Sequence, residues 1–400
     1  MNLIIIVAFL IAIFFYLLIP AGGAFYVRRR WRLFRKSVID SSSLPEVSYA
    51  KLKNVSDGYA GEFRMLGSLQ AIQGDDSVWI SNRAISLRVQ LTGVDVYTLP
   101  HSALIGKGRN ISIRENLTDE IPVRMPWNRF SSLPEGTRLL VSGSLYREKG
   151  QLLFKTSRET PLLVLIYDGS ENTILIRTIW AGRQQNEYIN DFTPGSMAAG
   201  GVILLLLTYL STRLTGADFY SWLIFTMALS PLFAILPPGL GLFELYLIFW
   251  RRGRRYRAER DLVLLSLRYW PGVDSLSYCS DIRLHGSQTY GYRLLESGRI
   301  AIEQVNGGRL INTGFLDNDT VMDSPVFVFG IVGDEAGQEL FPPSKDLMIS
   351  PLIIPGDPSV LFKICSKKAR IMEILAGLSL LAGFALNLFL FLLILRYIIY

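Results

Sequence analysis

The feature that most constrains this chain is a series of long apolar segments that alternate with clusters of basic residues. The first apolar segment, 3–19, carries no charge. A helix over these residues nearly covers the roughly 30 Å hydrocarbon core of a membrane. Further apolar segments lie at 197–212, 219–250 and 371–395. The pattern predicts an α-helical membrane protein with four spans.

A cleavable signal peptide is the alternative for the first segment. Signal peptides carry basic residues before the apolar run, whereas here the basic residues follow it, beginning with Arg28, Arg29 and Arg30. Moving this cluster outward would oppose the positive-inside rule. We therefore expect an uncleaved anchor at 1–26 with its N-terminus outside the cell.

Two more basic clusters adjoin the apolar segments. They contain Arg251, Arg252, Arg254, Arg255, Arg257 and Arg260 after the third segment, and Lys367, Lys368 and Arg370 before the last one. If each segment crosses once, every cluster lies in the cytoplasm. The sequence thus predicts a multi-pass protein of the cell inner membrane.

The basic clusters are also candidate lipid contacts. Anionic lipid attracts each basic residue near the bilayer surface by about 1 kcal/mol. The predicted contacts are Arg28, Arg29, Arg30, Arg251, Arg252, Arg254 and Arg255. The alternative is that these residues only fix the topology. Nucleic acid is not an expected partner, because no aromatic-interleaved reading motif accompanies the arginines.

The segments between the spans are expected to be β-rich. Alternation of apolar and polar residues at 84–91 is typical of a half-buried strand, and 137–155 predicts a hairpin with glycine at its turn. The predicted organisation is an anchor at 1–26, a cytoplasmic β-rich domain at 37–196, a transmembrane hairpin at 197–250, a second cytoplasmic β-rich domain at 261–370 and a transmembrane helix at 371–396.

The two β-rich segments share a pattern that predicts an internal duplication. Residues 141–154 align with 328–341 without a gap. A basic cluster at the end of a span precedes each copy, and another span follows each. Convergence of β-hairpins on glycine and alternating apolar residues is the alternative. The alignment continues through Pro-Leu and Asp-x-Ser, at 161–162 and 168–170 in the first copy and at 351–352 and 357–359 in the second.

The first copy resembles a known domain. Its pattern of apolar residues, Gly143-x-Leu145, a glycine turn and Gln-Leu-Leu-Phe at 151–154, followed by a span, is similar to the GIDE domain of membrane-anchored E3 ubiquitin ligases and their bacterial relatives. Ligase activity in that family needs a RING finger with Cys/His zinc ligands, and this chain has two cysteines. The resemblance implies a sensing or interaction domain between spans and no catalytic residue.

Glu244 is a candidate functional residue because it lies within the third apolar segment. An ionisable side chain inside a membrane is a functional hypothesis by default. Pro237 and Pro238 interrupt the same segment, so a broken helix of the kind found in transporters is an alternative to a single kinked span. Glu244 is also close enough to Arg251 along the helix to pair with it instead.

Nothing in the sequence predicts an enzyme, a metal site or a cofactor. Asp317, Asp319 and Asp323 would be the ligands of a metal, but an EF-hand needs a glycine and a bidentate glutamate that this loop lacks. The cysteines Cys279 and Cys365 and the histidines His101 and His285 form no catalytic motif.

The sequence favours a membrane scaffold or interaction protein, with a transporter or channel accessory subunit as the alternative. The expected partner is an unidentified membrane or cytoplasmic protein, bound at exposed sheet edges or loops. The small residues at 195–201 allow close helix packing, either within the chain or in a homo-oligomer.

Overall fold

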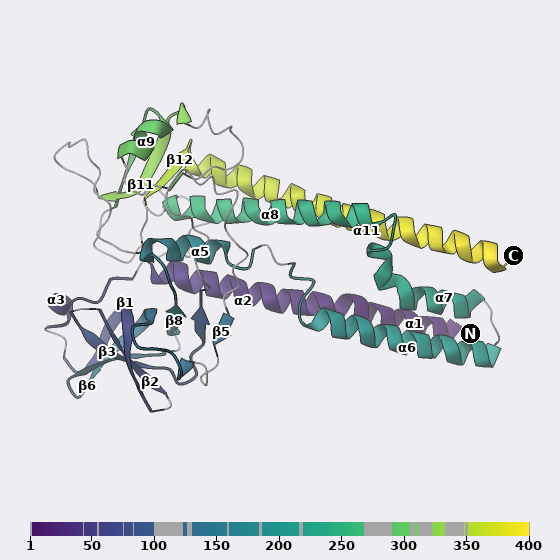
Figure 1. Ribbon diagram of the computed structural model, residues 1–400, viewed down its shortest axis with the longest axis horizontal. Helices are drawn as coiled ribbons and strands as arrows, with labels where there is room; N and C mark the ends of the chain where they lie inside the picture. The colour runs from purple at the N-terminus through teal and green to yellow at the C-terminus, as the bar shows by residue number, and fades with distance from the viewer. Residues whose placement is uncertain are drawn as a thin grey trace. The chain divides into compact units, whose positions relative to one another are not determined.

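The chain divides into two compact units (Figure 1). The helical unit comprises Met1–Leu33, Arg183–Arg257 and Ser366–Tyr400, and the β-rich unit comprises Phe34–Gly182 and Ala258–Cys365. Both predicted β-rich segments therefore belong to one unit. The computed structural model describes residues 2–42, 44–53, 56–74, 76–82, 84–99, 123–125, 130–157, 160–183, 186–215, 219–267, 290–304, 309–310, 322–332, 348 and 351–399.

Within these described residues, three helical stretches are long and apolar enough to cross a membrane: Leu3–Ser41, Phe192–Leu214 and Pro358–Tyr397. They are built from α1 (Asn2–Ile13), η1 (Phe14–Leu18) and α2 (Ile19–Ser41), from α6 (Phe192–Thr215), and from α11 (Pro358–Ile399). At 42 residues, α11 is about 63 Å long, roughly twice the thickness of a hydrocarbon core. The helices therefore continue beyond their apolar segments, and the basic clusters lie on these extensions.

The third predicted span is not a single kinked helix. It is divided into α7 (Phe219–Leu229), a 3-10 turn η3 (Ser230–Ala234) and α8 (Leu240–Leu267). The break coincides with Pro237 and Pro238, since proline cannot supply the backbone donor that a continuous helix needs. Neither α7 nor the apolar part of α8 reaches the about 20 residues of a full span. The predicted count of four spans therefore depends on whether the two pieces together make one crossing.

Asn387 of α11 satisfies the backbone at this break. Its Nδ2 atom donates to the carbonyl oxygens of Phe233 and Leu236, both at 2.7 Å, and the residue is 5% exposed. Such carbonyls need a partner because lipid offers none. Asn387 is thus an interhelical hydrogen-bond donor, as expected for an amide side chain within an apolar helix.

At the π-helical turn η1, a side chain of another helix likewise satisfies a backbone carbonyl. Its backbone bonds run from residue i to i−5, as from Ile19 to Phe14, so the Phe15 carbonyl would next pair with residue 20. Pro20 has no N–H to donate, and the hydroxyl of Ser196 in α6 donates to Phe15 instead. Close packing at Gly200, where an added Cβ would lie 2.6 Å from the Phe15 Cβ, permits this approach. The predicted small-residue face is thus used within the chain.

The β-rich unit contains a closed five-stranded barrel. Its strands follow the cyclic order β1-β2-β3-β7-β6-β1, in which β3 and β7 are parallel and the other pairs antiparallel. This is the order of a Greek-key barrel of the OB type. Because each barrel strand has two neighbours, the barrel offers no edge for strand addition. The strands are β1 (Gly58–Gln73), β2 (Ser77–Ser81), β3 (Ser86–Gln90), β6 (Arg138–Glu148) and β7 (Gln151–Lys155).

Alternating residues of the strands fill the barrel. Val78 and Ile80 of β2 and Leu87 and Val89 of β3 are fully buried in one cluster, while the residues between them face outward. This arrangement confirms the strand predicted from alternation at 84–91.

The predicted hairpin is also confirmed, with β6 and β7 joined by Lys149 and Gly150. Both turn residues have positive φ, 52° and 80°, as a type I′ hairpin requires. Within β6, Gly143 has a φ of 154° and an added Cβ would lie 3.0 Å from Leu162. At this residue β6 exchanges one neighbour for another, pairing with β8 before it and with β7 after it.

The first sheet continues beyond the barrel through β8 (Leu163–Ile166), β4 (Val96–Thr98) and β5 (Val123–Met125). A second sheet has the order β10-β12-β11-β9. Its strands are β9 (Tyr290–Leu295), β10 (Arg309–Leu310), β11 (Val326–Val332) and β12 (Leu352–Pro355), and the short helices of the unit are α3 (Tyr49–Leu52), η2 (Glu171–Thr173), α5 (Ile174–Trp180) and α9 (Gly298–Gln304).

The two sheets share a four-strand arrangement. The order β1-β6-β8-β4 in the first and β9-β11-β12-β10 in the second both pair as antiparallel, antiparallel and parallel. Val141 pairs with Val164 in the first sheet, and Val328 pairs with Ile353 in the second. If Val164 is equivalent to Ile353, the Asp-x-Ser motifs of the two copies fall at equivalent positions. The Pro-Leu motifs then differ in position by one residue. The sequence also predicts a hairpin at 330–341 in the second copy; its residues after Val332 lie outside the described residues.

One hydrophobic core contains residues from both β-rich segments. Ile176 and Trp180 of α5 belong to the same buried cluster as Leu262 of α8 and Phe329 and Ile354 of the second sheet. The last turns of α8 and the first turns of α11 contribute to this unit. This shared core explains why the two predicted domains form a single compact unit.

Candidate functional site

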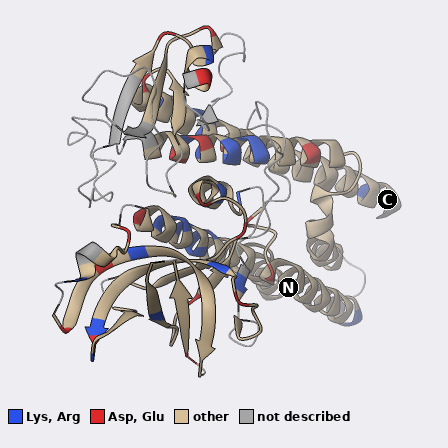
Figure 2. Ribbon diagram, turned by 60° about the vertical axis from the view of Figure 1, so that its left-hand side comes forward, with Lys and Arg blue, Asp and Glu red and all other residues tan. Residues whose placement is uncertain are grey.

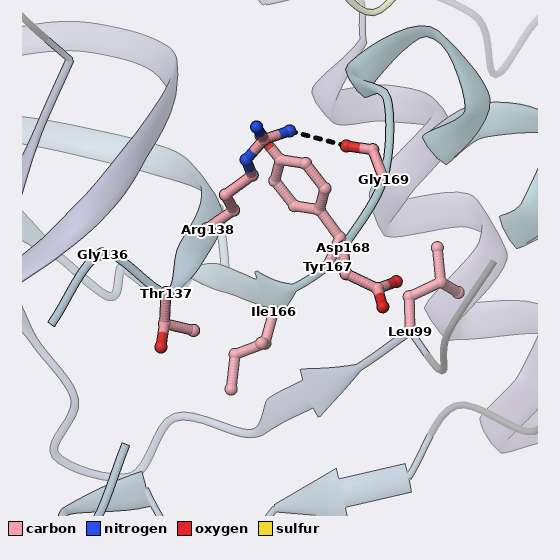
Figure 3. A pocket seen from close by; sticks show the side chains of 8 residues that line it. All are labelled: Leu99, Gly136, Thr137, Arg138, Ile166, Tyr167, Asp168 and Gly169. Carbon is pink, nitrogen blue, oxygen red and sulfur yellow. Dashed lines mark hydrogen bonds between the residues drawn. The ribbon is translucent and has the colours of Figure 1, made fainter. Parts of the chain in front are cut away.

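The β-rich unit has an open pocket of about 400 Å³ where β4, β6 and β8 meet (Figure 3). Leu99 and Ile166 supply apolar surface, and Arg138 and Asp168 supply charge. These residues converge because Tyr167 donates its backbone N–H to the Arg138 carbonyl at 3.2 Å, and Leu99 donates to Ile166 at 2.8 Å. The complete lining is Leu99, Gly136, Thr137, Arg138, Ile166, Tyr167, Asp168 and Gly169.

Arg138 and Tyr167 stand together on one side of the pocket (Figure 3). Arg138 Nη1 donates to the Gly169 carbonyl at 2.7 Å while the side chain stays exposed. Burial, followed by the nearby Glu171 carboxylate, raises the pKa of Tyr167, against an opposing effect of Arg138. The Tyr167 hydroxyl is engaged with the Glu171 side chain.

Arg177 joins the two chain segments that carry Leu99 and Asp168 of this pocket. It lies in α5, is 1% exposed, and its Nη1 donates to the Asp168 carbonyl at 2.6 Å. Its Nη2 reaches the Leu99 carbonyl at 3.4 Å and the Asp168 carboxylate at 3.3 Å. One guanidinium thus joins the ends of β4 and β8, which a planar fork of donors suits well.

Among the pocket residues, the sequence drew attention only to Asp168 and Gly169, as part of the repeated Asp-x-Ser motif, and it predicted no site there. A signal for Arg177 was available, because it is the lone charge in the otherwise apolar segment 174–180, and arginine is rarely fully buried unless it is paired. Arg138 and Tyr167 carry no such signal, since only the pairing of β6 with β8 brings them together.

A second candidate site lies in the helical unit, where two arginines of α8 are paired with glutamates. Arg254 Nη2 lies 2.7 Å from Glu187 Oε2, and both side chains are buried. Arg257 pairs with Glu373 of α11. The Arg254 guanidinium also lies over the ring of Trp250, 4.3 Å from its centroid. This is a favourable cation–π contact in a buried setting.

Burial sets the electrostatics of this cluster. Burial lowers the pKa of Arg254, while Glu187 and Glu373 act in the opposite direction. Burial likewise lowers the pKa of Arg257 to about 10, against the effect of Glu373. Arg28 of α2 lowers both pKa values further. Arginines from two separate basic clusters therefore lie near one another in this unit.

The predicted lipid-contact residues are not equivalent in the structure. Arg29, Arg251 and Arg252 are exposed, and Arg28, Arg30 and Arg255 are half-buried. Arg254 departs from the prediction, because it is buried and its charge faces Glu187 rather than a lipid headgroup. Figure 2 shows basic residues grouped on parts of some of the long helices, and long stretches of helix without charge.

Glu244, Pro237 and Pro238 are all exposed in the helical unit. Among the described residues, Glu244 has no hydrogen bond or ion pair, with Arg251 or otherwise. Functional carboxylates inside membranes usually face the bundle interior or a water-filled cavity. The structure therefore does not bring these three candidates into one site.

The predicted metal-binding alternative is only partly within the described residues. Asp317 and Asp319 lie outside them, as do Cys279, His101 and His285. Asp323 pairs with Arg299 at 3.0 Å on the surface, and Cys365 is buried as a free thiol. In the part of the chain that the structure describes, no group of three or more metal-ligating side chains occurs.

Comparison with known proteins gave no match among protein-family models, curated proteins or solved structures. The resemblance of the first hairpin to the GIDE domain therefore remains an expectation from the sequence. A function must be argued from the chain's own residues, because a barrel topology alone supports many functions.

Proposed function

We propose that this chain is a multi-pass protein of a cell inner membrane that holds its β-rich unit in the cytoplasm and acts as a scaffold or interaction protein without catalytic activity. The pocket at Arg138 carries this proposal. It combines the apolar surface of Leu99 and Ile166 with the charge of Arg138, and Arg177 joins the chain segments that carry Leu99 and Asp168. Such a combination suits recognition of another protein.

The basic clusters support the cytoplasmic placement. They follow the first and third apolar segments and precede the last one. A single crossing by each segment would therefore put all of them on the cytoplasmic side, where basic residues are enriched. This requires α7, η3 and the start of α8 to cross together as one broken span. Both β-rich segments then lie on the same side of the membrane.

The shared strand order supports an internal duplication. We infer that β1, β4, β6 and β8 correspond to β9, β10, β11 and β12, because their pairing directions agree and Val141 and Val328 occupy equivalent register positions. Arg138 and Tyr167 have no counterparts in the second copy, where the equivalent positions are Pro325 and Gly356. The four-strand arrangement is thus repeated, whereas the pocket residues Arg138 and Tyr167 occur in the first copy alone.

Labelling with a membrane-impermeant maleimide in intact cells tests both inferences. Single cysteines would replace Lys149 in the β6–β7 turn, Arg299 on α9 and Leu214 at the end of α6, all of which are exposed. We expect Lys149→Cys and Arg299→Cys to react only after permeabilisation and Leu214→Cys to react in intact cells. Arg299→Cys reacting on the opposite side from Lys149→Cys would contradict both the single broken span and the duplicated unit.

The pocket indicates the chemistry of the partner. Asp168 is engaged by Arg177, and Tyr167 interacts with Glu171, so Arg138 is the charge that remains directed to solvent. A partner segment with an apolar side chain for Leu99 and Ile166 and an acidic side chain for Arg138 would match. Charge-assisted hydrogen bonds to arginine are among the stronger polar contacts.

Site-specific photo-crosslinking in cells tests the pocket. A photoreactive residue at Thr137 is expected to give a discrete adduct with a partner protein, whereas one at Gln90, on the outer face of the barrel, is not. Adding Arg138→Glu should reduce the Thr137 adduct about tenfold, because it replaces attraction by repulsion. Equal adducts from both positions, or an adduct that persists with Arg138→Glu, would contradict this role.

The transporter alternative has weaker support. The broken third span favours it, but Glu244 is exposed and lies apart from the buried Arg–Glu pairs. Without an ionisable group facing the interior of the bundle at the break, the geometry supplies no evident pathway.

A further inference from the structure

Among the described residues of the helical unit, two buried or half-buried arginines have ion-pair partners, whereas the half-buried Arg28 near them has none. Asn190 Nδ2 donates to the Pro20 carbonyl of α2 at 3.2 Å and to the Glu187 carbonyl at 3.0 Å, so α2 packs beside the segment that carries Glu187. Glu187 and Glu373 pair with Arg254 and Arg257, and Arg28 of α2 lowers the pKa of both arginines. Among the described residues, Arg28 has no hydrogen bond or ion pair. A half-buried charge next to two other arginines is costly unless an anion accompanies it.

Hydrogen-bond donors are also in excess in this cluster. The Nε atoms of Arg28 and Arg254 and the Nε1 atom of Trp250 are buried and have no acceptor. Glu373 Oε1 is an unpaired acceptor in the same group, so donors outnumber acceptors by three to one. Buried polar groups are normally satisfied, which points to an additional acceptor at this place.

The position along the helices agrees with a phosphate group. Arg28 follows the predicted anchor 1–26 by two residues, and Arg254 follows the apolar start of α8. Charged and aromatic residues at the end of an apolar stretch lie at the headgroup level of a bilayer, and Trp250 and Tyr188 pack edge to face here. Phosphate offers several acceptor oxygens and matches the forked donors of arginine.

We propose that Arg28, which lies beside the Arg254–Glu187 and Arg257–Glu373 ion pairs, binds the phosphate of an anionic ligand in the helical unit. A phospholipid headgroup is the source that its position favours, and soluble phosphate has the same chemistry. This site differs from a general attraction of the basic clusters to anionic lipid, because it depends on one arginine, Arg28, that lies beside two ion pairs. Exposed neighbours such as Arg29 contribute only long-range attraction.

The test uses the full-length protein in a non-ionic detergent and measures the thermal unfolding shift during titration with phosphatidylglycerol, phosphatidylcholine or inorganic phosphate. Phosphatidylcholine carries a phosphate but no net charge. Arg28→Gln removes the proposed ligand. Arg29→Gln removes the same charge from the next, exposed position of α2 and is the matched control.

We expect phosphatidylglycerol to stabilise the wild type and Arg29→Gln similarly, and Arg28→Gln to need about tenfold more lipid. Arg28→Lys, which keeps the charge but not the fork, should fall between them. Stabilisation by inorganic phosphate alone, lost in Arg28→Gln, would support the site with a soluble ligand.

Three results would overturn the proposal: equal losses in Arg28→Gln and Arg29→Gln, equal effects of both lipids on every variant, or no stabilisation of the wild type. Equal losses would indicate a general attraction of the basic clusters to the lipid, without a defined site. Arg28→Lys keeps the test valid if Arg28→Gln does not fold, since lysine preserves the charge at this half-buried position.

Discussion

Replacing Arg254 with alanine is expected to lower the free energy of unfolding by about 3–5 kcal/mol. The substitution leaves Glu187 as an unpaired buried carboxylate, because the two side chains are only 6% and 9% exposed. It also removes the cation from the face of Trp250. Denaturant unfolding of the full-length protein in detergent, followed by tryptophan fluorescence, measures the effect.

Two further variants separate this cost from a general loss of charge. Arg251→Ala removes an exposed arginine from the same helix and should change the stability by no more than about 0.5 kcal/mol. The double variant Arg254→Ala/Glu187→Gln should recover part of the loss, because no uncompensated charge remains. If Arg251→Ala and Arg254→Ala cost the same, the buried ion pair does not stabilise the helical unit as inferred.

Replacing Arg177 with methionine is expected to cost about 3 kcal/mol. Methionine fills much of the volume but leaves the Asp168 and Leu99 carbonyls without their donor. The Asp168 carboxylate contributes less, because it is 42% exposed and solvent can compensate for it. Thermal unfolding of the full-length protein measures the change, and the same variant should weaken the Thr137 crosslink.

Arg138→Met is the matched control for this prediction. Arg138 also donates to a backbone carbonyl beside the pocket, but its side chain is exposed. Its replacement should leave the stability within about 0.5 kcal/mol of the wild type while it still reduces crosslinking. A stability loss as large as that of Arg177→Met would show that burial does not distinguish the two arginines.

Local sequence was sufficient for several elements. Gly150 marks a tight hairpin turn because glycine adopts positive φ readily, and residues 84–91 specify a strand by their alternation. Asn387 could be predicted as an interhelical donor, since a polar amide in an apolar helix needs a partner. Pro237 and Pro238 predicted where the helix is interrupted. They did not predict that the interruption would divide the segment into two separate helices.

Contacts between distant segments were not predictable in the same way. β1 and β6 close the barrel across some 80 residues of chain, as in the pairing of Phe63 with Gly143, so the sheet edges expected as partner sites are absent from the barrel. Arg254 was predicted to contact lipid, like its neighbours in the sequence, because its partner Glu187 is 67 residues away and no local pattern indicates the pairing. The pocket of Arg138 and Tyr167 depends likewise on strand order.

The sequence by itself determined which segments are apolar enough for a membrane and which are β-rich, because hydropathy and alternation are properties of consecutive residues. Only the tertiary structure decided which arginine is paired and which is left alone, that five strands close on themselves, and that α5 and α8 share a core with the second sheet. Burial and ion pairing arise between residues far apart in the chain, so their outcome depends on packing rather than on any local pattern.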